Sequence, residues 1–375
     1  MGILRTPSTP SPSRIYQADL KTPYNNRSAT WCFDYYFHPD SLMKNYYKII
    51  AAILALNATL GVSAKKHYTN PVISESSPDP TVIRAENGAY YLYATENTRN
   101  VPIYRSSDLI NWNFVATAFN EESRPQWNPK GNIWAPDINY IAGKYVLYYS
   151  KSVWGEEWDC GIGVASAESP EGPFTDNGAL FISKEIDVQN SIDPFFIEEN
   201  GRNYLFWGSF HGIYGIELSA DGLSIKEGAE KVRIADNFME GTYIHKHNGL
   251  YYLFGSTGSC CDGERSTYRV TIGRSENLFG PYVDKQGRRL LDGNFDVILS
   301  RSQKVIGPGH NAEIVTDDKG CEWMLYHGFS AEAPEKGRLV YLDRVYWIDG
   351  WPIIGDGQPS ERAKAPTIKK KKNQR

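Results

Sequence analysis

Cysteine is scarce in this sequence. Only five of the 375 residues are cysteines, and no Cys-x-x-Cys pair or histidine-rich spacing accompanies them. This usage excludes a disulfide scaffold and gives no sign of a structural zinc site. Cys260 and Cys261 are adjacent, which normally prevents an ordinary bridge between them. The pair is therefore either reduced or closed as a vicinal disulfide that stiffens a loop.

Sustained helical periodicity and hydrophobic runs of membrane-spanning length are also missing. The apolar residues 49–60 follow a short basic start at Met43 and precede the small residues Val62, Ser63 and Ala64. This stretch is too short to cross a bilayer comfortably, and its layout is typical of a secretory signal peptide. We therefore predict a signal peptide over residues 43–64, a secreted or periplasmic protein, and no stable membrane span once the peptide is removed.

Residues 1–42, ahead of this signal, show no periodicity and are rich in Ser, Pro, Tyr and Asn. We interpret them as a non-native or disordered N-terminal extension. The alternative is a genuine cytoplasmic arm before an uncleaved anchor. N-terminal sequencing of the natural protein separates the two, because a start before Lys65 contradicts the cleaved signal peptide.

Positive charge is sparse in the body of the chain. Residues 65–360 carry 27 Lys and Arg against 40 Asp and Glu, a net charge of −13. So acidic a body does not suit a polyanion, which argues against nucleic acid as a partner. Basic residues gather instead in residues 361–375, where seven Lys and Arg accompany one acid. We predict that this segment is a basic disordered tail.

Aromatic residues, by contrast, are abundant at 13% and recur in a pattern. Five aromatic-rich segments with a central leucine repeat at intervals of 48 to 72 residues, and polar turns rich in Gly and Asn separate them from the strands before them. The central residues are Leu92, Leu147, Leu205, Leu253 and Leu325. Repeats of this length built from short strands predict an all-β fold, a five-bladed β-propeller over residues 65–360.

One acidic residue lies 10 to 13 residues before each leucine: Asp79, Asp137, Asp193, Glu240 and Glu313. The innermost strand of a propeller blade lines the central channel, so acids that begin these strands should converge at one mouth. A buried unpaired carboxylate is costly, and three at the same repeat position (Asp79, Asp193 and Glu240) therefore indicate function. The alternative for Asp-Pro pairs is structural, because proline begins a strand without needing an N–H partner.

Several motifs resemble those of glycoside hydrolase family 43. They are Asp79-Pro-Thr-Val-Ile, Trp134-Ala-Pro-Asp137-Ile, Asn190-Ser-Ile-Asp193-Pro, Trp207-Gly-Ser-Phe210 and Glu240-Gly-Thr-Tyr-Ile. The sequences Cys260-Cys261, Ser266-Thr-Tyr and Gly307-Pro-Gly-His310-Asn311 are similar to the arabinanase branch. The resemblance runs from about residue 70 to about residue 352. It implies a five-bladed propeller, in agreement with the number of repeats.

The resemblance also implies roles for the three acids. Asp79 would be the general base that activates water, and Glu240 the general acid that protonates the leaving oxygen. Asp193 would raise the pKa of Glu240 and hold it in place. An inverting hydrolase needs such a pair, with one carboxyl kept protonated by burial and a nearby negative charge. The family motif more often reads Glu-Ala-Pro where this chain has Glu240-Gly241-Thr242, which leaves the acid in place but changes its surroundings.

Further residues are assigned to ligands by the same resemblance. His310 would face a calcium ion in the central channel. Calcium prefers oxygen ligands, so one histidine needs ordered waters to make such a site, and the alternative is a histidine hydrogen-bonded within the channel. The residues expected to contact sugar are Trp134, Asn190, Ser209, Phe210 and His211, although ordinary packing is the alternative for each. Asp137 is assigned to fixing the start of its strand.

Together these features predict an exported, inverting hydrolase of α-1,5-linked L-arabinofuranose chains, acting on arabinan or related oligosaccharides of the plant cell wall. Four alternatives stay open. Two are related exo-acting enzymes, an α-L-arabinofuranosidase or a β-xylosidase. The third is a propeller that binds glycan or protein without catalysis. The fourth is a retaining fructan hydrolase, whose product would keep its anomeric configuration.

Overall fold

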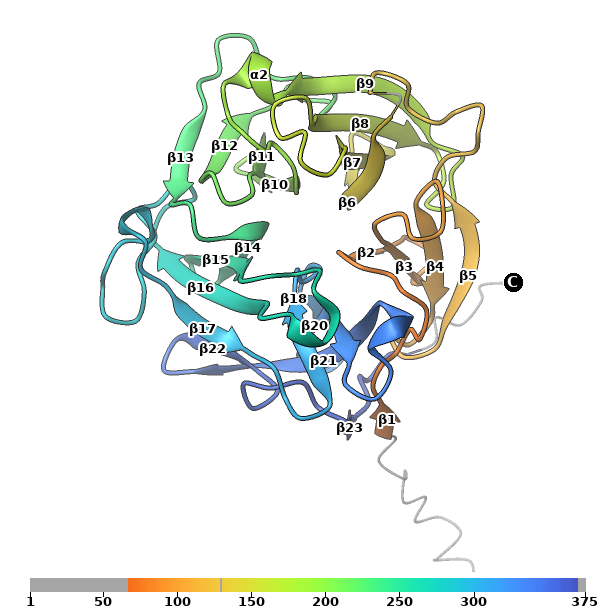
Figure 1. Cartoon of the computed structure of the whole chain (residues 1–375), viewed down its shortest axis with the longest axis vertical. Helices are drawn as coiled ribbons and strands as arrows, with labels where there is room; N and C mark the ends of the chain where they lie inside the picture. The colour runs from red at the N-terminus through yellow and green to blue at the C-terminus, as the bar shows by residue number, and fades with distance from the viewer. Residues whose placement is uncertain (1–66, 129, 370–375) are drawn as a thin grey trace, which may run out of the picture. The chain divides into compact units, whose positions relative to one another are not determined.

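Five antiparallel sheets stand around a central axis, each with its first strand toward the centre (Figure 1). The computed structural model describes residues 67–128 and 130–369. The predicted all-β, five-bladed β-propeller is confirmed. The predicted extension over residues 1–42 and signal peptide over residues 43–64 lie outside the described residues. Within the described chain, no helix has the length and hydrophobicity needed to span a bilayer.

Each blade is a meander of four strands, and the fifth blade carries one short extra strand. Blade 1 comprises β2 (Thr81–Arg84), β3 (Tyr90–Tyr93), β4 (Pro102–Ser106) and β5 (Trp112–Thr117). Blade 2 comprises β6 (Asn132–Ile141), β7 (Lys144–Ser152), β8 (Gly161–Ala167) and β9 (Thr175–Ile182). Blade 3 comprises β10 (Phe195–Glu199), β11 (Arg202–Trp207), β12 (Ile213–Glu217) and β13 (Val232–Ala235).

Blade 4 comprises β14 (Glu240–His247), β15 (Leu250–Thr257), β16 (Arg269–Ser275) and β17 (Asp296–Leu299). Blade 5 comprises β18 (Val305–Gly309), β20 (Glu322–Ser330), β21 (Arg338–Ile348) and β22 (Trp351–Ile354), with β19 (Val315–Thr316) paired to β20. The short helical turns are α2 (Ser183–Ile186), η1 (Gly263–Arg265), η2 (Leu290–Asp292) and η3 (Pro334–Lys336).

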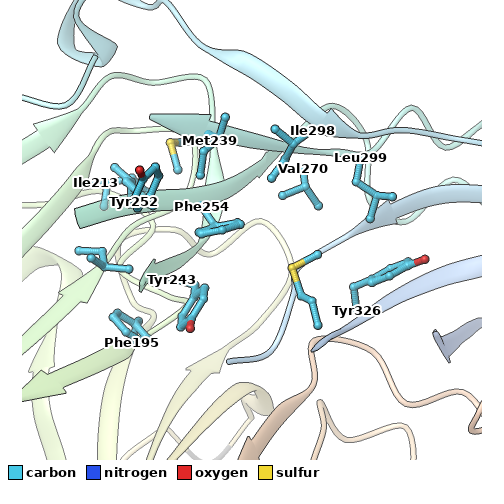
Figure 2. Packing of buried hydrophobic residues seen from close by; sticks show 14 of the residues in the cluster. Phe195, Ile213, Met239, Tyr243, Tyr252, Phe254, Val270, Ile298, Leu299 and Tyr326 are labelled. Carbon is cyan, nitrogen blue, oxygen red and sulfur yellow. The ribbon is translucent and has the colours of Figure 1, made fainter. Parts of the chain in front are cut away.

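The five repeat leucines lie in the second strand of each blade and are completely buried. Side chains from both faces of these strands fill the spaces between neighbouring blades, which explains why the segments are apolar without alternation. Figure 2 shows one such layer, where Phe195 and Tyr243 meet edge to face and Phe254 packs beside them. Truncating a fully buried leucine of this kind typically costs about 2–5 kcal/mol of unfolding free energy.

The two ends of the propeller meet beside blade 5. Strand β1 (His67–Thr69) pairs with β23 (Arg362–Lys364), and Asn70 then hydrogen-bonds to the backbone of Leu342 and Ser360. The backbone N–H of Thr367 donates to Asp317 at 2.9 Å. The structure thus differs here from the predicted disordered tail: residues 362–364 pair with β1 and Thr367 is hydrogen-bonded to Asp317, contacts that a basic composition does not reveal.

Each blade has a residue with left-handed backbone in or beside its inner strand: Asp79, Ala135, Asp193, Gly241 and His310, with φ between 39° and 64°. Three of them are supported by a side-chain hydroxyl from the preceding blade, in its second strand or just after it. Thr95, Ser150 and Ser256 accept the backbone N–H groups of Ala135, Asp193 and His310 respectively. At the fifth junction, His327 Nδ1 accepts the N–H of Asp79 at 3.0 Å. At four of the five junctions, one blade thus holds the left-handed residue of the next.

Asp137 and Glu313 do not occupy this left-handed position, and they form a buried pair of their own. Their carboxyls hydrogen-bond to each other, which requires a proton between them. Asp137 also accepts the N–H of Phe196 in blade 3, and Glu313 accepts the N–H of Val82 in blade 1. The pair therefore ties non-adjacent blades together across the channel, and the assignment of Asp137 to a structural role is consistent with these contacts.

This acid pair predicts a pH-dependent stability. Burial and the charge of Glu313 raise the pKa of Asp137 well above its ordinary value, and burial raises the pKa of Glu313. The folded pair keeps protons that the unfolded chain has released, so the free energy of unfolding falls as pH rises through the raised pKa values. Glu313→Gln should flatten that fall by up to about 1.4 kcal/mol per pH unit, measured by urea unfolding between pH 5 and pH 9. Parallel curves for variant and wild type would contradict the shared proton.

Candidate active site

The mouth of the propeller holds a pocket of about 530 Å³. Asp79, Asp193 and Glu240 all line it, although blades 1, 3 and 4 supply them. All three carboxyls are buried, with Asp79 at 8%, Asp193 at 5% and Glu240 at 9% exposure. The spatial part of the sequence prediction therefore agrees with the structure, while the roles of the acids stay predictions.

Asp79 is surrounded by cationic and donor groups. Its Oδ1 accepts Arg338 Nη1 at 2.9 Å and lies 3.3 Å from His310 Nδ1, and its Oδ2 accepts the Thr95 hydroxyl at 2.6 Å. Burial alone would raise the pKa of this carboxyl. The charges of Arg338 and His310 and the hydrogen bond of His327 outweigh burial and hold the pKa of Asp79 well below its ordinary value. Asp79 is a carboxylate over the whole neutral range.

Asp193 and Glu240 have the opposite electrostatics. Burial, followed by the negative charges of Glu240 and Asp79, raises the pKa of Asp193 well above its usual range. Burial likewise raises the pKa of Glu240, and the hydrogen bonds from Ser209 and Tyr268 only partly offset this. Two interacting carboxyls of this kind titrate as a pair, and ionisation of one makes ionisation of the other harder.

The Glu240 carboxyl can exist in either protonation state without losing its partners. Its Oε2 accepts the Ser209 hydroxyl at 2.6 Å and its Oε1 accepts the Tyr268 hydroxyl at 2.8 Å. A hydroxyl donates to a carboxylate and can rotate to accept from a carboxylic acid. The site is therefore built to let Glu240 gain and lose a proton in place.

Gly241, which follows Glu240, has a backbone conformation and surroundings that suit glycine. Its φ is 64°, and a Cβ at this position would lie 3.1 Å from the ring of His310. Its N–H donates to Asp193 Oδ2 at 3.0 Å. Glycine fits this left-handed, crowded backbone at low cost, and the hydrogen bond sets Asp193 beside Glu240.

Four of the five predicted sugar contacts line the pocket: Trp134, Asn190, Ser209 and Phe210. Asn190 Nδ2 donates to the Ser209 hydroxyl oxygen at 3.0 Å, which joins two of them. His211 is the exception and does not belong to the lining. Its Nε2 lies 3.1 Å from Oε2 of Glu157, which does line the pocket.

Sequence reasoning missed several residues of the pocket. Arg338 lies in blade 5 outside every repeated motif, and Thr95 follows a repeat leucine by three residues. Trp154 lies on the rim with 78% of its surface exposed and its ring edge toward Trp134. An exposed tryptophan at a pocket mouth suits stacking on the apolar face of a sugar. The sequence did not single out Trp154, because aromatic residues are abundant and most of the others are core residues.

The adjacent cysteines also line the pocket. Cys260 and Cys261 are joined in a vicinal disulfide, with Cα atoms 3.8 Å apart, and Ser259 and Asp262 flank them in the lining. Of the two alternatives left by the sequence, the structure shows the oxidised one. The thiol groups of Cys160 and Cys321 are free.

His310 was predicted to face calcium. Its Nδ1 points between two carboxyls, 3.3 Å from Asp79 and 4.0 Å from Asp193, and burial lowers its pKa. Among the described residues, no group of three potential protein ligands includes His310. The residues present therefore fit only an ion held mainly by water.

A pocket that places an ionised carboxylate and a coupled pair of carboxyls with raised pKa values together is compatible with the two-carboxyl chemistry of glycoside hydrolases. Residues 68–352 match the family model described as glycosyl hydrolases family 43. The chain belongs to this family and is a glycosidase.

Curated relatives and solved structures agree on the family. The chain is 34% identical over 288 residues to the extracellular endo-α-(1→5)-L-arabinanase 1 of Bacillus subtilis, which covers 73% of this chain and 86% of that protein. It is 29% identical over 346 residues to the extracellular exo-α-(1→5)-L-arabinofuranosidase ArbA of Cellvibrio japonicus, covering 85% and 95%. The α-L-arabinanase of Cellvibrio cellulosa complexed with arabinohexaose superimposes with a TM-score of 0.68 at 30% identity, covering 75% of this chain and 96% of that one.

Proposed function

We propose that this protein is an exported glycosidase that hydrolyses α-1,5-linked L-arabinofuranose chains with inversion of the anomeric centre. The opposed electrostatics of the three acids carry the proposal: in one pocket, the pKa of Asp79 is lowered, whereas the pKa values of the buried pair Asp193 and Glu240 are raised. The relatives named arabinanase and arabinofuranosidase support the substrate class. The names of both relatives include the word extracellular, which supports export.

In the proposed reaction, Asp79 accepts a proton from the water that attacks the anomeric carbon. Glu240 donates its proton to the glycosidic oxygen as the bond from that oxygen to the anomeric carbon breaks. Asp79 is a weak base because its pKa is low, but the attacking water becomes acidic as its bond to the sugar forms. Burial disfavours the ionised form of Glu240, coupling to Asp193 opposes ionisation of both acids together, and Asp193 accepts the backbone N–H of Gly241. Trp134, Trp154 and Phe210 offer apolar faces to the sugar rings, and Asn190 offers an amide.

Product analysis tests this proposal directly. The protein is incubated with linear arabinan, branched arabinan and xylan, and products are followed by length over time and by proton NMR for the first-formed anomer. We expect release from arabinan with an inverted anomer. A retained anomer would contradict the role of Asp79. Faster hydrolysis of xylan than of arabinan would show that the proposed substrate is wrong.

An exo-acting enzyme is the second candidate, because one relative of high coverage is named an exo-enzyme. Early accumulation of a single short product indicates exo action. A mixture of oligosaccharides of intermediate length that become shorter with time indicates endo action. The same time course therefore decides between the two.

Asp193→Asn should reveal the charge coupling to Glu240. Asp193 and Glu240 repel each other when both are ionised, since the charge of Glu240 raises the pKa of Asp193. The repulsion is mutual, so replacing Asp193 with a neutral amide should make ionisation of Glu240 easier. We expect the alkaline limb of the kcat/KM profile to move to lower pH, together with a loss of activity, while the acid limb set by Asp79 changes less. An unmoved alkaline limb would mean that Asp193 acts only on structure.

Calcium beside His310 is also a proposal, for a site in which water supplies most ligands. We expect prolonged dialysis against a chelator to lower the melting temperature and added calcium to restore it. If neither the chelator nor added calcium changes the melting temperature or the activity, His310 does not bind calcium and is held only by its neighbours Asp79 and Asp193.

A further inference from the structure

A second cluster of ligand-type side chains lies far from the catalytic pocket. His245 and His247 are at the end of β14, and Glu322 begins β20 of the next blade. Glu240 begins the same β14, so roughly 20 Å of strand separates the two histidines from the pocket. None of the three residues lines that pocket. The cluster therefore serves something other than the proposed hydrolysis.

The three side chains converge on one point. Because alternate residues of a strand share a face, His245 and His247 point the same way. One ligand atom from each of the three residues lies within 4.8 Å of the other two. Glu322 Oε1 is 3.6 Å from His245 Nε2 and 3.6 Å from His247 Nδ1. Ligands of a tetrahedral zinc ion, at about 2.0–2.1 Å from the metal, are about 3.4 Å apart.

These distances do not describe a satisfied hydrogen-bonded cluster. At 3.6 Å, neither histidine makes a normal hydrogen bond with Glu322 Oε1. His245 Nε2 is a buried atom with no hydrogen-bond partner. A buried ring nitrogen without a partner is costly, and a bound cation would supply the missing interaction.

The outer atoms of the cluster are held by other residues. The Tyr243 hydroxyl lies 2.9 Å from His245 Nδ1, which leaves Nε2 toward the cluster. Trp347 Nε1 donates to Glu322 Oε2, which leaves Oε1 toward the cluster. The His247 ring stacks on Trp347 with centroids 3.6 Å apart and planes 7° apart. Partners of this kind orient the ligands of metal sites.

We propose that His245, His247 and Glu322 form a binding site for a zinc-class transition metal that joins blades 4 and 5. Two imidazoles and one carboxylate are a ligand set that such ions favour over calcium or magnesium. The three side chains are 17%, 21% and 18% exposed, so an ion can enter and a water can complete the coordination. The metal acts as a cross-link between the last two blades, and binding to the folded state alone stabilises that state.

Metal content is the direct test. The protein, without a polyhistidine tag, is stripped with a chelator, loaded with zinc at pH 7.5 and dialysed, and bound zinc is measured by mass spectrometry and by calorimetric titration. Glu322→Gln retains an acceptor for Trp347, and His247→Gln removes a second ligand. Exposed His67, on β1, provides the matched control His67→Gln. Circular dichroism verifies that each variant is folded.

We expect the wild type and His67→Gln to bind one zinc equivalent more than Glu322→Gln and His247→Gln. Removing an orienting partner weakens metal binding by about 10–100-fold, and removing a ligand should weaken it further. Zinc should also raise the melting temperature of the wild type and leave that of the two ligand variants unchanged. Because the comparison is between variants, zinc bound at the catalytic acids does not affect it. Equal zinc content in all four proteins, or no zinc in the wild type, overturns the proposal.

Discussion

Glu240→Gln should lower turnover of arabinan by about 10²–10⁴-fold, the usual contribution of a general acid. The loss arises because a sugar alkoxide is a poor leaving group and needs a proton as it departs. Aryl arabinofuranosides with good leaving groups need little protonation, so their hydrolysis should be largely spared. Initial rates on both substrates, measured side by side, give the ratio directly.

The glutamine variant is a clean test because its surroundings can adapt. The amide oxygen can accept one of the two hydroxyls that bind Glu240, and the amide nitrogen can donate to the other. We therefore expect the melting temperature to change little. Equal collapse on both substrates would show that Glu240 is not the proton donor.

Asp79→Asn should reduce both activities alike, by a similar factor of about 10²–10⁴. Water must be activated whatever the leaving group is, so the aryl substrate brings no rescue. The asparagine oxygen can still accept Arg338, which keeps that buried guanidinium from losing its partner entirely. Kinetics on both substrates and a thermal melt are the measurements.

The contrast between the two variants carries more information than either loss. A binding propeller without catalysis would show no activity to lose, and unchanged sugar release in Asp79→Asn would remove these acids from the chemistry. Selective rescue of Glu240→Gln, together with uniform loss in Asp79→Asn, is the pattern that only an acid and a base in separate roles produce.

Much of the fold was predictable because its repeat is carried by local signals. Each leucine marks a second strand that is buried on both faces, and all five leucines are completely buried. The three catalytic candidates were found because an acid at a strand start contradicts burial. Counting back from the leucines was too coarse, however, to separate these acids from Asp137 and Glu313. A shift of one or two residues along a strand start turns a side chain to a different neighbour.

The other functional candidates depend on contacts between distant residues, which a local sequence pattern cannot predict. Arg338 reaches Asp79 across 259 residues, and Glu322 meets two histidines from the preceding blade. His245 and His247 do form a His-x-His pair in the sequence, but a third ligand from a distant strand is what makes the pair notable. The hydroxyls of Thr95, Ser150 and Ser256 could have been found, since each follows a repeat leucine by three residues.

Those hydroxyls have a consequence for how the enzyme fails. Ser150 of blade 2 positions Asp193 of blade 3, and the ring of His327 in blade 5 likewise positions Asp79, so these candidate acids are each held by a neighbouring blade. A small displacement between two neighbouring blades would misplace an acid while every sheet stayed intact. Activity should therefore be lost at a lower temperature than the β-structure, because it depends on the contacts between neighbouring blades.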